Sequence, residues 1–143
     1  MQRLEGEDNM KIIEWAQKMS VQVAEIDDQH KKLVEIINAA FSIENPSENR
    51  KKFEPILNDL IEFTRVHFST EEKYFDKFNY AEKDEHIEEH LKLIDAVLKF
   101  KDGFDSGKCD CEPFLSFLRD WLAEHLLKMD QKYIECFKAN GLE

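Results

Sequence analysis

The five histidines of this chain are its clearest candidates for chemistry. His86 and His90 are four residues apart in HIEEH, a spacing that places two imidazoles on one face of a helix. All five fall on the apolar stripes of helical segments, the others being His30, His67 and His125. A single histidine on such a stripe is usually a core residue satisfied by a hydrogen bond. Five buried imidazoles need a common partner, and a metal is the simplest one.

Two carboxylates accompany the histidines. Glu71 follows His67 by four residues in HFSTEE and shares its helix face, whereas the neighbouring Glu72 is expected to point elsewhere. Asp130 follows His125 by five residues, which is about 140° around a regular helix. Spacing alone therefore supports Glu71 as a ligand and leaves the role of Asp130 open.

The size of this ligand set indicates more than one metal. A structural zinc takes four ligands, so five imidazoles and two carboxylates are too many for one ion. Two six-coordinate ions bridged by both carboxylates and by one oxo or hydroxo group would use the whole set and leave one position open. Such a site accepts one small ligand. Imidazole and carboxylate together suit iron, although ligand type alone also fits zinc, cobalt or manganese.

Helical periodicity shows which elements must position these residues. It covers four segments, at about 26–41, 47–78, 82–101 and 112–139. With only 4 Gly and 3 Pro, the chain suits a few long helices, so we predict an all-α, up-down-up-down four-helix bundle. Pro55 either kinks the second helix or marks the start of its regular part. Trp15 and the alternating MSVQVAEI predict an extended N-terminal arm over 1–25, followed by the bundle over 26–143.

Composition limits the classes of partner. The net charge of −11 disfavours nucleic acid and anionic membranes as partners. No stretch reaches the roughly 18 apolar residues of a membrane span, and the N-terminus lacks the apolar run of a signal peptide, so we expect a cytoplasmic protein. Cys109, Cys111 and Cys136 are an odd set. The C-D-C stretch could bind a soft metal or be oxidised, and free thiols are the preferred interpretation.

Four motifs in this order and spacing resemble those of the hemerythrins, especially the single-domain bacterial kind. They are IDDQHKKL at 26–33, HFSTEE at 67–72, HIEEH at 86–90 and WLAEHLLKMD at 121–130. Each motif is weak alone, but together they use every histidine in the chain. The chain departs from the usual bacterial pattern in having Gln22 where a glycine is common, Leu126 where isoleucine is preferred, and Pro55 inside the second helix.

The resemblance implies a non-haem di-iron centre with an oxo or hydroxo bridge. It assigns one iron to the three histidines His86, His90 and His125. It assigns the other iron, which keeps the open position, to His30 and His67. Glu71 and Asp130 would bridge the two irons.

The resemblance implies reversible dioxygen binding, for oxygen transport, storage or delivery. One alternative is a di-iron enzyme with peroxidase, oxidase or nitric oxide reductase activity. Another is an oxygen or iron sensor that acts through an unidentified protein partner. Oxygen-activating bundle enzymes typically carry Glu-x-x-His pairs, and no such pair precedes any histidine here. We therefore expect a binding protein and not an enzyme, with slow peroxide turnover left open.

Overall fold

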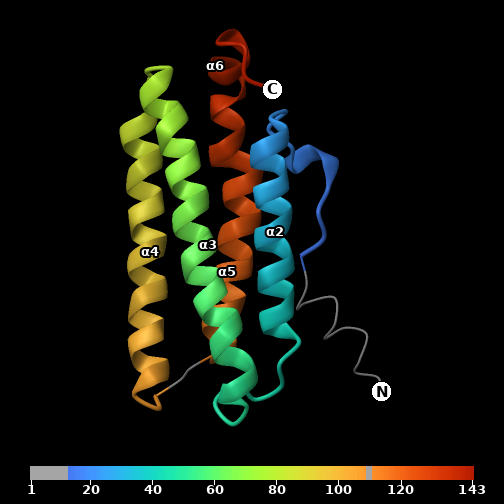
Figure 1. Cartoon of the computed structure of the whole chain (residues 1–143), viewed down its shortest axis with the longest axis vertical. Coiled ribbons are helices and arrows are strands. Elements are labelled where there is room, and N and C mark those ends of the chain that lie inside the picture. The colour runs from blue at the N-terminus through green and yellow to red at the C-terminus, as the bar shows by residue number, and fades with distance from the viewer. Residues whose placement is uncertain (1–12, 109–110) are drawn as a thin grey trace.

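Four long antiparallel helices make up the computed structural model, which describes residues 13–108 and 111–143. The helices are α2 (Ala24–Phe41), α3 (Arg50–Lys77), α4 (Lys83–Asp105) and α5 (Cys111–Glu124), with the short α6 (Ile134–Ala139) continuing the direction of α5 (Figure 1). Helix α2 packs against α3 and α5, and α3 packs against α4. The described residues contain no strand. The predicted all-α four-helix bundle is confirmed.

Three of the predicted helices differ in their bounds. The fourth, predicted as continuous over 112–139, is divided into α5, a π turn over His125–Met129, a 3₁₀ turn over Asp130–Tyr133 and α6. Helix α3 begins at Arg50 and continues through Pro55, so the proline does not mark its start. Helix α4 continues past Gly103 to Asp105 and ends before Gly107, whose φ of +79° is the left-handed conformation that glycine adopts readily. Gly103 suits its place inside the helix because the backbone of Lys108 comes close to it and leaves little room for a side chain. A Cβ at that position would lie 3.2 Å from the carbonyl oxygen of Lys108.

The described part of the arm, residues 13–23, runs beside α2 (Figure 1). It is irregular apart from a 3₁₀ turn at Gln17–Met19, and it buries four apolar side chains, Ile13, Met19, Val21 and Val23. Asp27 of α2 fixes its end, because its carboxylate accepts hydrogen bonds from the Ser20 hydroxyl and the Val21 amide. Residues 1–12 of the predicted arm lie outside the described residues.

The apolar core falls into two clusters. The larger one, which we call the aliphatic cluster, includes Leu33, Ile37, Leu57, Leu60, Phe68, Leu93, Leu118, Leu122 and Leu126. The smaller one, the aromatic cluster, consists of Val21, Val23, Ile26, Tyr74, Phe75, Tyr80, Tyr133 and Phe137. Seven buried histidines and carboxylates form a polar layer between them along the helices. On α2, for example, His30 lies between Ile26 and Leu33, and on α3 Glu71 lies between Phe68 and Phe75.

The cysteines only partly match the predicted free thiols. Cys136 is free, whereas Cys111 is disulfide-bonded, so the prediction is wrong for Cys111. Cys109 lies outside the described residues. Within the described ranges, no helix combines the length and the apolar character needed to cross a membrane.

Candidate metal centre

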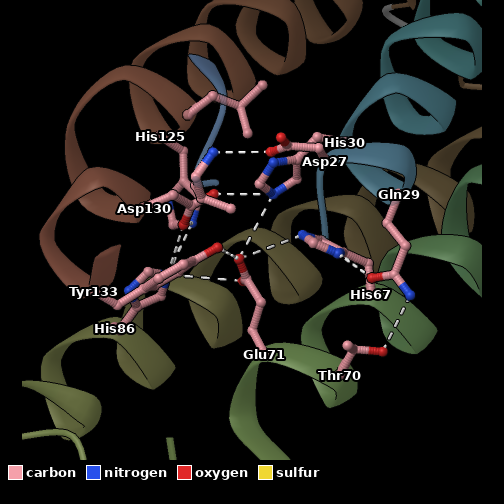
Figure 2. A network of polar contacts seen from close by, with 12 residues as sticks. Asp27, Gln29, His30, His67, Thr70, Glu71, His86, His125, Asp130 and Tyr133 are labelled. Atoms are coloured by element: carbon pink, nitrogen blue, oxygen red, sulfur yellow. Dashed lines mark hydrogen bonds and ion pairs between the residues drawn. The ribbon is translucent and has the colours of Figure 1, made fainter. Parts of the chain in front are cut away.

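The structure brings all seven predicted ligand residues together in the polar layer, and none is more than 4% exposed. Their nitrogen and oxygen atoms form two groups, in each of which the atoms lie within 4.8 Å of one another. One group contains Glu71, His86, His90 and His125. The other contains His30, His67, Glu71 and Asp130. Figure 2 shows six of the seven side chains converging from α2, α3, α4 and the segment that follows α5.

Glu71 faces both groups. Its Oε1 atom lies 3.0 Å from His90 Nε2, and its Oε2 atom lies 3.6 Å from the Nε2 atoms of His30 and His67. The spacing of four residues between His67 and Glu71 on α3 accounts for this placement, because it puts both side chains on the inward face. A carboxylate held in this way presents one oxygen to each group.

Asp130 has the same two-sided arrangement. Its Oδ1 atom lies 3.0 Å from the Nε2 atoms of both His86 and His125, and its Oδ2 atom lies 3.1 Å from His30 Nε2. The five-residue spacing from His125 is compatible with this position because His125–Met129 forms a π-helical turn. A π turn hydrogen-bonds from residue i to i+5 and so brings residues five apart onto one face.

Several polar atoms of the layer converge on common points. His30 Nε2, His90 Nε2, Glu71 Oε1 and both oxygens of Asp130 are buried without a hydrogen bond. The Nε2 atoms of His86 and His125 face each other at 3.1 Å, an arrangement in which at most one nitrogen can donate. Buried lone pairs aimed at a shared point are costly in the protein alone, and a cation at that point would satisfy them. The donor set therefore fits bound metal ions.

The electrostatics of the protein without metal agree with this fit. Burial opposes ionisation, but the surrounding imidazoles hold the pKa of both Glu71 and Asp130 well below the usual range. Burial also disfavours the charged form of His30 and His90, yet the carboxylates close to these rings outweigh it and raise the pKa of each to about 9. At His67 burial prevails and lowers the pKa to about 4. Two protons can thus balance the two carboxylates when no cation does.

Three contacts that the sequence reasoning missed surround the cluster. The Tyr133 hydroxyl donates to Glu71 Oε2 at 2.5 Å. Nδ1 of His67 lies 2.7 Å from Gln29 Oε1 (Figure 2). Nδ1 of His90 lies 2.8 Å from Glu72 Oε2.

The last of these contacts corrects the expectation for Glu72. Its side chain leaves the inward face of α3, as predicted, but it reaches His90 on α4 and is only 33% exposed. Helix-face geometry describes one helix at a time, so it could not show what the neighbouring helix presents.

A small cavity adjoins the cluster on the side of the aliphatic cluster. Its volume is about 10 Å³, measured for the centre of a water-sized sphere. Its walls include His30, His67 and His125, and most of its other residues are apolar, among them Leu33, Ile37, Leu60, Phe68, Leu93, Leu118, Trp121, Leu122 and Leu126. This volume suits one small molecule next to the metal ligands.

Comparisons with known proteins agree with the geometry. Residues 21–137 match the family model described as the hemerythrin HHE cation binding domain. A bacteriohemerythrin of Methylococcus capsulatus is 30% identical over 132 residues, which cover 91% of this chain and 100% of that protein. A hemerythrin-like protein of Naegleria gruberi is 29% identical over 119 residues, which cover 83% of this chain and 88% of that protein.

A solved structure of wild-type hemerythrin matches the fold with a TM-score of 0.78 at 29% identity, covering 87% of this chain and 96% of that one. The matched residues include the whole polar layer and all four long helices. The chain belongs to the hemerythrin family.

Proposed function

We propose that this chain binds dioxygen reversibly at a non-haem di-iron centre, as a protein of oxygen transport, storage or delivery. The observation that carries the proposal is the small apolar cavity next to His30 and His67. These are the only two imidazoles in their ligand group, whereas the other group has three. With one imidazole fewer, this group would keep the open coordination position, and two of the three histidines that line the cavity belong to it.

The proposed ligand assignment follows from the two groups. His86, His90 and His125 would hold one iron, and His30 and His67 would hold the other. Glu71 and Asp130 would bridge, since each turns one oxygen toward either group. Bound iron would supply the electrons for reversible dioxygen binding.

The residues around the cavity favour retention of the ligand over its chemical conversion. A general acid must lie within hydrogen-bond reach of the group that it protonates. Apart from the proposed ligands, the cavity is lined by apolar side chains, Trp121 and one hydroxyl residue, Thr64. Among the described residues, the one carboxylate in the lining is the proposed ligand Asp130, and the lining has no lysine and no histidine beyond the proposed ligands. Apolar walls also disfavour charge separation, so the site supports binding better than peroxidase, oxidase or reductase turnover.

The wider setting of the protein is part of the same proposal. We infer a cytoplasmic protein with an arm over 1–25 and a bundle over 26–143. The net charge of −11 supports partners other than nucleic acid and membranes. No feature of the described residues identifies a protein partner.

The test is the absorption spectrum of the anaerobically reduced, iron-loaded protein before air, after air and after removal of oxygen. We expect two irons per chain by metal analysis, no haem, and a new absorption band that disappears on deoxygenation. One metal per chain, or a preference for zinc at equal supply, would overturn the di-iron proposal. Repeated turnover of peroxide with an added reductant would instead favour the enzyme.

A further inference from the structure

We propose that Glu72 and Gln29 make the two metal sites electrostatically unequal, so that the three-histidine site preferentially holds the cation of higher charge. The inference deepens the proposed function and rests on it for the identity of the sites. It concerns the atoms behind two of the imidazoles, on the side away from the cluster. One ring, His90, has a carboxylate behind it, and another, His67, has a neutral amide.

The orientation of the Gln29 amide follows from its other partner. The Thr70 hydroxyl donates to the Val66 carbonyl oxygen at 3.1 Å, so its oxygen is left to accept from Gln29 Nε2 at 3.2 Å. The Gln29 Oε1 atom therefore faces His67 and accepts from its Nδ1–H at 2.7 Å. This hydrogen bond leaves His67 Nε2 free to face Glu71, and it adds no charge behind the ring (Figure 2).

The group behind His90, the Glu72 carboxylate, is charged. A carboxylate only accepts, so the 2.8 Å contact fixes a proton on His90 Nδ1 and directs the Nε2 lone pair toward Glu71. Phe68 stacks on the His90 ring with centroids 3.7 Å apart and an interplanar angle of 5°, which holds the ring in this orientation. An anionic acceptor draws the Nδ1 proton and makes Nε2 a stronger donor to a metal. Partial burial of Glu72 limits the screening of its charge.

These two contacts distinguish the sites because two of the other rings lack such partners. The Nδ1 atoms of His30 and His86 are buried without a hydrogen bond. His90 belongs to the three-histidine group and His67 to the two-histidine group. The only carboxylate that the described residues place behind a ring of the cluster therefore lies behind the three-histidine group.

A pair of redox-silent ions tests the inference without dioxygen. Ga³⁺ and Zn²⁺ differ in charge, and their affinities can be measured by competition with a chelator. Glu72→Gln removes the charge and keeps the shape, whereas Gln29→Glu adds a charge behind His67. The control is Glu88→Gln, which removes the same charge from an exposed position on α4.

Changes to residues that orient metal ligands typically cost about 10–100-fold in affinity. We expect Glu72→Gln to lower the ratio of Ga³⁺ to Zn²⁺ affinity by about tenfold or more, Gln29→Glu to raise it, and Glu88→Gln to leave it within about twofold. In iron, a tenfold loss of ferric over ferrous affinity corresponds to a potential about 59 mV higher. A Glu72→Gln ratio equal to that of Glu88→Gln would overturn the inference.

A second measurement locates the ion of higher charge. With one Ga³⁺ and one Zn²⁺ per chain, imidazole ¹⁵N shifts should place Ga³⁺ on His90 in the unmodified protein. In the Gln29→Glu/Glu72→Gln double variant, which has the same net charge, Ga³⁺ should move toward His67. An unchanged distribution would show that the two contacts do not set the preference. Failure of the iron form to bind dioxygen, with these ion preferences intact, would refute the proposed function but leave the charge inequality standing.

Discussion

His125 and Asp130 are five residues apart in the chain, yet His125 Nε2 lies 3.0 Å from Asp130 Oδ1. On a regular helix the two side chains would diverge by about 140°. The π-helical turn over His125–Met129 removes this divergence, and a 3₁₀ turn over Asp130–Tyr133 follows it. The irregular winding that follows α5 thus turns both side chains of one segment toward the polar layer.

We therefore predict that Asp130→Ala weakens iron binding at both sites. Its two oxygens face different groups, so its loss removes a ligand from each. The loss of affinity should be at least the ~10–100-fold that changes around metal ligands cause. Iron titration measures it, with Glu124→Ala, an exposed acid one residue before His125, as the control. Two irons bound normally in Asp130→Ala would show that this residue is no bridge. Asp27, the acid three residues before His30, would be a poor substitute as the second bridging carboxylate, because it already accepts hydrogen bonds from Ser20 and Val21.

Tyr133→Phe should weaken metal binding by about tenfold and destabilise the metal-free fold by about 1.5–3 kcal/mol. The variant deletes the hydroxyl that donates to Glu71 Oε2 in a fully buried setting. Tyr80→Phe is a matched control, because the Tyr80 hydroxyl is buried without a hydrogen bond and its removal sacrifices none. Denaturant unfolding and metal titration of both variants check the prediction. Equal effects of the two changes would contradict it.

Gln22→Gly should stabilise the protein, whereas Gln22→Ala should not. Gln22 has φ of +63°, a left-handed conformation that costs a residue with a Cβ about 1–2 kcal/mol. Glycine avoids that cost but loses more chain entropy on folding, so the expected net gain is about 0.5–1 kcal/mol. The comparison is made by denaturant unfolding. A gain for alanine equal to that for glycine would show that the backbone at this position is not the cause.

Leu126 offers a test of the cavity that leaves the metal ligands unchanged. The residue is fully buried and lines the cavity beside His125. Leu126→Phe should slow dioxygen association by filling that space, at a cost of about 1–3 kcal/mol in stability. Leu126→Ile keeps the volume and should alter the autoxidation rate more than the metal content. Stopped-flow mixing and metal analysis follow both variants, and a loss of iron that matches any loss of binding would contradict the prediction.

The metal-free protein should lose stability as the pH rises above neutrality. The pKa of His30 and of His90 is raised to about 9 in the fold, against an ordinary value of 6.5. The stability that protonation of these two histidines contributes is therefore fully present below pH 6.5 and is lost as the pH rises through 9. The lowered pKa of His67, about 4, acts in the opposite sense and destabilises the fold as the pH falls below 6.5.

The expected loss between pH 7 and pH 10 is on the order of 5 kcal/mol in the free energy of unfolding of the metal-free chain, about 2.5 kcal/mol from each of the two histidines. Urea unfolding across this range measures it. The zinc-loaded protein is the control, since imidazoles that bind metal carry no proton on Nε2. An equal pH dependence with and without zinc would count against the explanation that protons on His30 and His90 balance the two carboxylates of the metal-free protein.

Residue spacing predicted the bundle and placed every histidine inward because burial follows one face of each helix. It placed Glu71 for the same reason. The position of Asp130 required the π turn, and HLLKM has no local signature that distinguishes such a turn from regular helix. Contacts between helices were also beyond the sequence reasoning. Gln29 reaches His67 from α2, and Glu72 reaches His90 on α4, so both depend on how neighbouring helices pack.

The polar layer between the aliphatic and aromatic clusters has a consequence for how the bundle opens. The two clusters have separate buried members. The polar layer that divides them is stabilised by protons on its histidines in the metal-free chain, and by cations when metal is bound. Amide hydrogen exchange should then show two zones of protection in the metal-free chain, with the aromatic end opening independently of the aliphatic end. Metal held by the proposed ligands would join α2, α3, α4 and the segment that follows α5, so it should merge the two zones into one cooperative unit.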